Sequence, residues 1–146
     1  MVDNSGSDST GNHIGTIAIQ AGNMLKLNEQ INLSINQSIA NDKDIQASGA
    51  HAASMTIPYG YWRMNASHAK SDYASEIIGN VLTFTNEGET STQQLNLSKV
   101  LHRDAKKIIR ASLGYKHQKV DNFINQTQLS SSSYTLRTIS PSVEMQ

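Results

Sequence analysis

The sequence predicts an all-β protein whose antiparallel strands run up and down a single sheet. Apolar and polar residues alternate strictly over residues 31–35 and 109–115, which places neighbouring side chains on opposite faces of an extended strand. No apolar stripe of helical length appears; the strongest competitor, residues 100–109, runs directly into the alternation over 109–115. The connections between the predicted strands alternate between short and long.

Strand length and connection length favour a transmembrane barrel over a soluble protein. The alternation extends over about 9–11 residues in each strand, which is enough to cross a bilayer at a tilt. The connections are short near residues 58–60 and 103–106 and longer near 41–49, 71–79 and 120–133. Outer-membrane barrels likewise have short periplasmic turns and long external loops. A soluble up-and-down barrel or a sandwich also produces this alternation, so both stay open as alternatives.

The composition excludes several classes of protein. Only 37% of the 146 residues are hydrophobic and 16% are charged, but the clear periodicity and the two prolines argue against disorder. The net charge of zero removes the electrostatic case for nucleic-acid binding. The absence of cysteine excludes disulfides and thiolate metal sites. The sequence contains no run of about 18 apolar residues, so it predicts no transmembrane helix. Its first residues lack the basic and apolar regions of a signal peptide.

The N-terminal part of the chain is predicted to contain two complete strands. Val2-Asp3-Asn4 is typical of the end of a preceding strand. The other elements are a polar stretch over residues 1–12, strands over 13–21 and 31–39, a connection over 22–28 and a loop over 40–49.

A hairpin with a very short connection is predicted over residues 57–62, because apolar and polar residues alternate on both sides of this segment. Pro58 has a fixed φ and no N–H group, and Gly60 supplies the conformational freedom of a tight reversal, so both are predicted to lie in the turn. Tyr61 and Trp62 stand where one strand becomes the next. In a membrane barrel they would belong to the aromatic girdle at the interface, and in a soluble protein they would form an ordinary aromatic turn.

The second half of the chain is predicted to contain four strands. The first continues from the hairpin to about Tyr73. The elements that follow are a loop over 71–79, a strand from Leu82 to Leu101 that includes the polar residues 86–89, a charged turn over 102–106, a strand over 109–115, a polar, serine-rich stretch over 123–133, and a last strand over 134–139 that Pro141 interrupts.

No motif in the sequence supports catalysis. His102-Arg103-Asp104 begins like a kinase catalytic loop, but the position five residues after the aspartate is Ile109 instead of asparagine, and no glycine-rich loop accompanies it. The five histidines never occur at metal-ligand spacing, and no G-x-S-x-G motif is present. Glu87 and Glu89 fit a solvated loop or strand rim better than a pair of catalytic acids. The sequence therefore predicts no enzyme, no cofactor and no metal site.

Three basic residues, Arg63, Arg110 and Lys116, fall on the polar parity of long strands. In a barrel the side chains at these alternate positions face the lumen, where charge is tolerated and can contact a passing substrate. In a soluble sheet the same side chains would face water.

Five short segments follow one another along the chain: Val2-Asp3-Asn4-Ser5-Gly6 with Thr10-Gly11, Asn28-Glu29-Gln30-Ile31, residues 57–62, Ser71-Asp72-Tyr73, and Val100-Leu101-His102-Arg103-Asp104. They resemble successive landmarks of the TpsB transporters, which are the outer-membrane partners of two-partner secretion and are also called haemolysin secretion/activation proteins. Their order and spacing match the family through most of the chain.

The resemblance implies a sixteen-stranded transmembrane barrel in the outer membrane, preceded by periplasmic POTRA domains. Such proteins move one large exoprotein, usually a haemolysin, an adhesin or a contact-dependent toxin, across the membrane without ATP. Residues 1–146 would correspond to part of the N-terminal half of the barrel, from the end of its first strand to about its eighth. The signal peptide, the POTRA domains and the C-terminal half would be absent. The Val-Arg-Gly-Tyr tetrapeptide that marks an inward loop of the superfamily does not occur in this sequence.

The implied partners are a secreted TpsA-type exoprotein and outer-membrane lipid. The missing half of the barrel, or self-association, would be needed to close the wall, because unpaired strand edges are costly in lipid. The alternative is a soluble all-β domain with an adhesin-like binding function. In that case the faces would pack on each other, and the domain would be stable in water without detergent.

Overall fold

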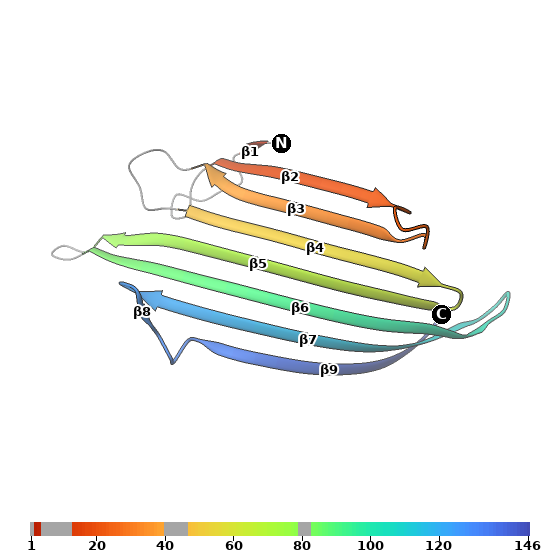
Figure 1. Ribbon diagram of the computed structural model, residues 1–146. Helices are drawn as coiled ribbons and strands as arrows, with labels where there is room; N and C mark the ends of the chain where they lie inside the picture. Colours follow the sequence, from red (N-terminus) through yellow and green to blue (C-terminus); the bar gives the residue numbers. More distant parts are fainter. Residues whose placement is uncertain (1, 4–12, 40–46, 79–82) are drawn as a thin grey trace.

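The chain forms a single layer of antiparallel β-strands. The computed structural model describes residues 2–3, 13–39, 47–78 and 83–146 (Figure 1). The strands are β1 (Val2–Asp3), β2 (His13–Gly22), β3 (Gln30–Ile39), β4 (Ala47–Tyr59), β5 (Trp62–Ile78), β6 (Thr83–Arg103), β7 (Ile108–Ile124), β8 (Thr127–Gln128) and β9 (Tyr134–Met145). Each strand from β1 to β7 pairs with the next, and both β8 and β9 pair with β7. The prediction of an all-β, up-and-down sheet is confirmed. Among the described residues, no helix is long and apolar enough to cross a membrane.

The central strands are much longer than the alternation predicted. β5, β6 and β7 contain 17, 21 and 17 residues. The predicted loop over 71–79 is wrong as far as residue 78, because residues 71–78 continue β5 and pair with residues 83–90 of β6. Both faces carry mainly small, polar or charged side chains in this region, so the apolar alternation disappears while the backbone ladder continues. The prediction for 4–12 and part of that for 40–49 lie outside the described residues, as does Leu82.

Pro58 lies inside β4, opposite Arg63, and not in the turn as predicted. The turn consists of Gly60 and Tyr61, with Gly60 at a φ of 59°. The ladder between β3 and β4 ends at the pair of Gln30 with Thr56. At the level of Pro58, β4 therefore has a neighbour on one side only, and a missing N–H group is tolerated there.

The C-terminal part of the sheet also differs from the prediction of a long polar loop. β7 continues to Ile124, and a turn at Asn125 and Gln126, with φ of 48° and 63°, leads into β8. After residues 129–133, β9 resumes the pairing with β7. Pro141 does not interrupt β9, because it pairs with Leu113 and the ladder to β7 continues on both sides of it.

In the middle of the sheet the register separates apolar from polar side chains, because residues paired across antiparallel strands lie on the same face of the sheet. One row joins Ala21, Ile31, Met55, Ala66, Leu95, Tyr115 and Ile139 across seven strands, and the neighbouring row joins Gln20, Asn32, Ser54, Ser67, Gln94, Lys116 and Thr138. We call the faces that carry these two rows the apolar face and the polar face.

Within the residues that the structure describes, neither face is covered by a second layer (Figure 1), and no hydrophobic side chain is buried. Ile17, Ile139 and Val143 of the apolar face are 64%, 70% and 73% exposed. An uncovered apolar face of this extent requires a non-aqueous neighbour or a partner.

The apolar residues of the apolar face form a band that runs obliquely across the strands. We call the end of the sheet with the β2–β3, β4–β5 and β6–β7 turns the turn end, and the opposite end the loop end. Near the loop end, Ile35 of β3 is paired with His51 of β4, which is paired with Lys70 of β5. Near the turn end, apolar residues continue further on β7 and β9, where Ile109 pairs with Met145. The apolar residues therefore shift towards the turn end from β2 to β9.

The β2–β3 turn, residues 23–29, folds around the side chain of Glu29, which is only 1% exposed. Its two carboxylate oxygens accept hydrogen bonds from the backbone N–H groups of Leu25, at 2.9 Å, and Leu27, at 3.2 Å. These hydrogen bonds hold the pKa of Glu29 below its usual range, and the bond from Leu25 has the largest effect.

The backbone of the same turn repeatedly adopts positive φ. Asn23, Lys26 and Asn28 have φ of 56°, 59° and 55°, a region in which asparagine is several-fold enriched. Asn23 Oδ1 also accepts a hydrogen bond from the N–H group of Asn28 at 3.1 Å. The turn is thus closed by side chains at both of its ends.

Tyr73 of β5 lies across Gly88 of β6. A Cβ atom added at Gly88 would overlap Cε1 of Tyr73 and would lie 2.7 Å from its Cζ and 2.9 Å from its Oη. The Tyr73 hydroxyl reaches Oδ1 of Asn122 on β7, at 3.4 Å. The ring therefore bridges three strands, and only glycine leaves room for it.

Gly88→Ala is expected to lower the free energy of unfolding by about 1–3 kcal/mol, the usual cost of overpacking, because the new methyl group displaces the Tyr73 ring. Urea unfolding of the folded protein measures this loss. Gly114→Ala is the matched control, since its Cβ would meet nothing nearer than 3.7 Å. Equal losses in the two variants would contradict the packing argument, and adding Tyr73→Ala to Gly88→Ala should remove most of the difference.

Glu29→Gln is expected to weaken the β2–β3 turn at neutral pH but to have little effect in acid. The pKa of Glu29 is lower in the folded than in the unfolded protein, so its carboxylate contributes stability above about pH 4.3, the ordinary value for glutamate. This contribution is lost as the pH falls through the folded value. Hydrogen-exchange protection of the Leu25 and Leu27 amides, measured against pH, should therefore converge between the wild type and the variant in acid. Glu76→Gln, at the other end of the strands, is the control; a difference that stays constant with pH would refute the role of the charge.

Candidate functional site

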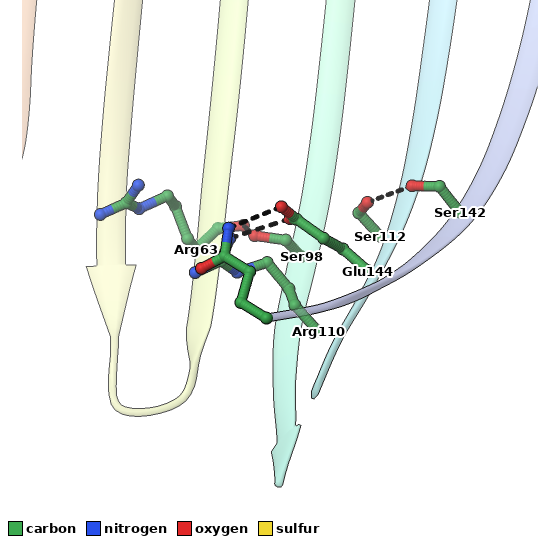
Figure 2. A network of polar contacts seen from close by, with 7 residues as sticks. Arg63, Ser98, Arg110, Ser112, Ser142 and Glu144 are labelled. Carbon is green, nitrogen blue, oxygen red and sulfur yellow. Dashed lines mark hydrogen bonds and ion pairs between the residues drawn. The ribbon is translucent and has the colours of Figure 1, made fainter. Parts of the chain in front are cut away.

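The three basic residues singled out by parity lie on the polar face, and Figure 2 shows two of them, Arg63 and Arg110, towards the turn end of β5 and β7. Arg63 shares a row with Ser98 and Ser112, and Arg110 lies one position nearer the turn than Ser112 on the same face. Lys116 lies on this face further along β7. We call Arg63, Arg110 and Lys116 the basic patch.

Polar contacts fix the strands around the basic patch. Arg110 Nη1 lies 3.3 Å from Oε2 of Glu144 on β9, and the hydroxyls of Ser112 and Ser142 are hydrogen-bonded at 2.7 Å between β7 and β9 (Figure 2). The Ser98 hydroxyl donates to the carbonyl oxygen of Arg63 at 3.4 Å. Arg110 is thus held by a carboxylate across one ladder.

The other two members of the patch are available to a ligand. Within the part of the chain that the structure describes, neither Arg63 nor Lys116 forms an ion pair. A guanidinium group donates a planar fork of hydrogen bonds, and an ammonium group acts as a mobile point charge. Both bind carboxylates and carbonyl oxygens reversibly when water has access. The arrangement therefore suits repeated, weak contact with polypeptide.

The residues of the predicted hairpin motif lie at the turn end of the sheet, with Trp62 on the apolar face and Pro58 on the polar face. Tyr59 and Trp62 are paired across the hairpin, and Tyr59 and Tyr61 are 79% and 68% exposed. Lys99 Nζ lies 4.7 Å from the centre of the Trp62 ring, in a cation–π contact. Gly60 forms the reversal itself. The result is an exposed aromatic cluster with a cation beside it; Lys99 was missed from the sequence because 37 positions separate it from Trp62.

The charged segment predicted as a turn connects β6 and β7. Asp104 accepts hydrogen bonds from the backbone N–H groups of Lys106 and Lys107, both at 2.8 Å, and lies 2.9 Å from His102 Nε2. The hydrogen bond with His102, followed by those from the backbone, holds the pKa of Asp104 below its usual range. Its carboxylate thus organises the turn.

Two histidines lie side by side on the apolar face, where its apolar part ends towards the loop side, and a third lies two strands away from one of them. The rings of His51 and His68 are 6.3 Å apart. His68 also shares a row with Gln93 and His117. Their positions in the sequence are too far apart to reveal this, although all three interrupt the apolar parity of their strands. Close by, Lys70 forms an ion pair with Glu89 at 2.7 Å.

Comparison with known proteins identifies the family. Residues 1–145 match the family described as haemolysin secretion/activation protein ShlB/FhaC/HecB. The chain is 30% identical over 132 residues to the outer membrane transporter CdiB-2 of Burkholderia pseudomallei, and 28% identical over 144 residues to the outer membrane transporter CdiB of Escherichia coli. These alignments cover 90% and 95% of this chain but 22% and 24% of the two relatives, so the chain spans about a quarter of their length.

Solved structures show the same arrangement of strands. CdiB from Escherichia coli matches 99% of this chain with a TM-score of 0.88 and 27% identity, over 27% of its own chain. CdiB from Acinetobacter baumannii, at 19% identity and a TM-score of 0.77 over 99% of this chain and 26% of its own, shares the fold. Because the family match extends over almost every residue and the sheet agrees with that of a solved relative, the chain belongs to the ShlB/FhaC/HecB family of haemolysin secretion/activation proteins.

Proposed function

We propose that this sheet forms part of the wall of an outer-membrane pore that translocates a large exoprotein in two-partner secretion. One observation carries the proposal: across seven strands the sheet keeps one uncovered apolar face and one continuous polar face. In a transmembrane barrel these faces meet lipid and a water-filled lumen. Family membership supports the same function, and the relatives named above are outer membrane transporters.

The oblique course of the apolar residues supports placement in a membrane. Strands in such barrels tilt by about 35–45° to the barrel axis, so the plane of the membrane crosses the hydrogen-bonded rows at an angle. The shift of apolar residues from Ile35 on β3 to Ile109 on β7 follows that geometry. A soluble adhesin-like sandwich is not favoured, because it would need a second sheet to cover the apolar face.

The described sheet is open, since β1 and β9 are not paired with each other. Unpaired strand edges are not tolerated in the hydrocarbon region. We therefore infer that further strands, from the same protein or from a second copy, close the wall, and that this sheet supplies about half of a sixteen-stranded barrel. The short turns would lie on the periplasmic side, and the long extensions of β5, β6 and β7 would project outward.

Translocation along this wall needs no catalytic group. The polar face offers mainly short hydroxyl and amide side chains, which form hydrogen bonds with an unfolded chain that water readily replaces. Arg63 and Lys116 add contacts to carboxylates and carbonyl oxygens. The passage is passive, and folding of a TpsA-type exoprotein outside the cell gives it direction.

A chimera tests the function. Residues 1–146 replace the matching segment of Escherichia coli CdiB, and the chimera is expressed in a host without that transporter together with the cognate exoprotein. We expect the chimera to stay in urea-washed outer membranes, to migrate differently on unboiled gels and to secrete the exoprotein. A chimera that is released as soluble, folded protein would overturn the proposal.

Reversing the charge of the two members of the basic patch that form no ion pair in the described part of the chain is expected to slow secretion. Arg63→Glu combined with Lys116→Glu should lower export by roughly two- to tenfold, the effect of losing contacts worth about 0.5–1.5 kcal/mol. Arg137→Glu is the matched control, because its row with His117 places it on the apolar face. Gel migration of unboiled samples verifies assembly of each variant. Equal losses of secretion from the patch variant and the control would refute a role of the lumen wall.

A further inference from the structure

The β2–β3 turn exposes three apolar side chains within four residues. Met24, Leu25 and Leu27 are 69%, 59% and 50% exposed. Turns of this kind normally carry glycine, asparagine, aspartate or serine, and a cluster of exposed apolar side chains marks a contact surface. The β6–β7 turn shows the usual composition, with Asp104, Lys106 and Lys107.

The buried carboxylate of Glu29 fixes the backbone of the turn so that these side chains point outward. Glu29 accepts hydrogen bonds from the N–H groups of Leu25 and Leu27 themselves. Both residues thus have their backbones directed at the carboxylate in the interior of the turn, while their side chains remain exposed. The turn does not need to rearrange to present its apolar surface.

The position of the turn continues the apolar part of the apolar face. Ala21 and Ile31 form the last apolar pair of β2 and β3. The next pair, Gly22 with Gln30, ends the ladder, and the turn connects these two residues. The β2–β3 ladder ends at the level of Thr56 of β4. The turn therefore lies near the level of the turn end of the β4–β5 hairpin (Figure 1). This is where Tyr59 and Trp62 of the aromatic cluster are paired.

We propose that this turn is a membrane-interface anchor, which inserts Met24, Leu25 and Leu27 into the phospholipid of the periplasmic leaflet. The inference rests on the proposed function, because it needs the apolar face to meet lipid. The β2–β3 hairpin has no aromatic residue at this level, so the three apolar side chains take the place that Tyr59 and Trp62 occupy on the β4–β5 hairpin. Lys26, between them, is long enough to direct its ammonium group to lipid phosphates.

The absence of cysteine from the chain permits a direct test. Leu25→Cys is introduced into the chimera with Escherichia coli CdiB, freed of any cysteines of that partner sequence, and labelled with an environment-sensitive NBD fluorophore. The labelled protein is reconstituted into vesicles of phosphatidylethanolamine and phosphatidylglycerol. Quenching is then measured with brominated lipids and with aqueous iodide. Ala105→Cys on the β6–β7 turn is the matched control, and Leu27→Cys is a second site in case the first variant folds poorly.

We expect brominated lipid to quench the label at residue 25 strongly, and iodide to quench it at least threefold less than the label at residue 105. Strong iodide quenching at both positions would overturn the anchor, since the turn would then face water. Protection from both quenchers would also overturn it, since protein would then cover the turn. These results count only for vesicles in which the chimera migrates as a folded barrel, so failure of the anchor is distinguishable from failure of the proposed function.

Discussion

The structure depends on one constraint, which is that the hydrogen-bonded register must not slip across the sheet. Successive side chains of a strand point to opposite faces, so a shift of one residue would exchange the two faces of every strand beyond it. The single irregularity between β6 and β7 falls between Val100 and His102, close to the turn end. It moves His102 opposite Ile109 only after the long two-faced region is complete. The apolar and polar faces therefore stay distinct wherever the proposed function needs them.

Stability in this sheet comes from its ladders and its surroundings instead of from a core. Side chains add contacts between neighbouring strands: the Tyr73 ring over Gly88, the ion pair of Lys70 with Glu89, and the ion pair of Arg110 with Glu144. The first two contacts lie where neither face is mainly apolar, so lipid would not stabilise those parts of the strands. Exposed ion pairs contribute little singly, and the close fit of the Tyr73 ring over Gly88 does not depend on charge.

The sequence predicted those parts of the fold in which one face is apolar. Alternation located β3 and the turn half of β7, and the parity of Arg63 and Lys116 assigned them to one face. It missed residues 71–78, because a strand that is polar on both faces has no periodic signal and is defined only by its partner. The pairing of Arg110 with Glu144 and the capture of two backbone N–H groups by Glu29 depend on three-dimensional proximity, which local patterns do not contain. Pro58 was misplaced because its tolerance depends on where the neighbouring strand ends.

The length of β6 has a consequence for the cargo. Its 21 residues, at about 3.3 Å each, extend roughly 70 Å, which exceeds the thickness of a bilayer even at the tilt of a barrel strand. In the proposed transporter the wall would therefore extend well above the lipid surface. A polypeptide inside this extension would remain in a space too narrow for it to become compact. The extension would separate the place of transit from the place of folding and keep a half-folded exoprotein from blocking its own exit.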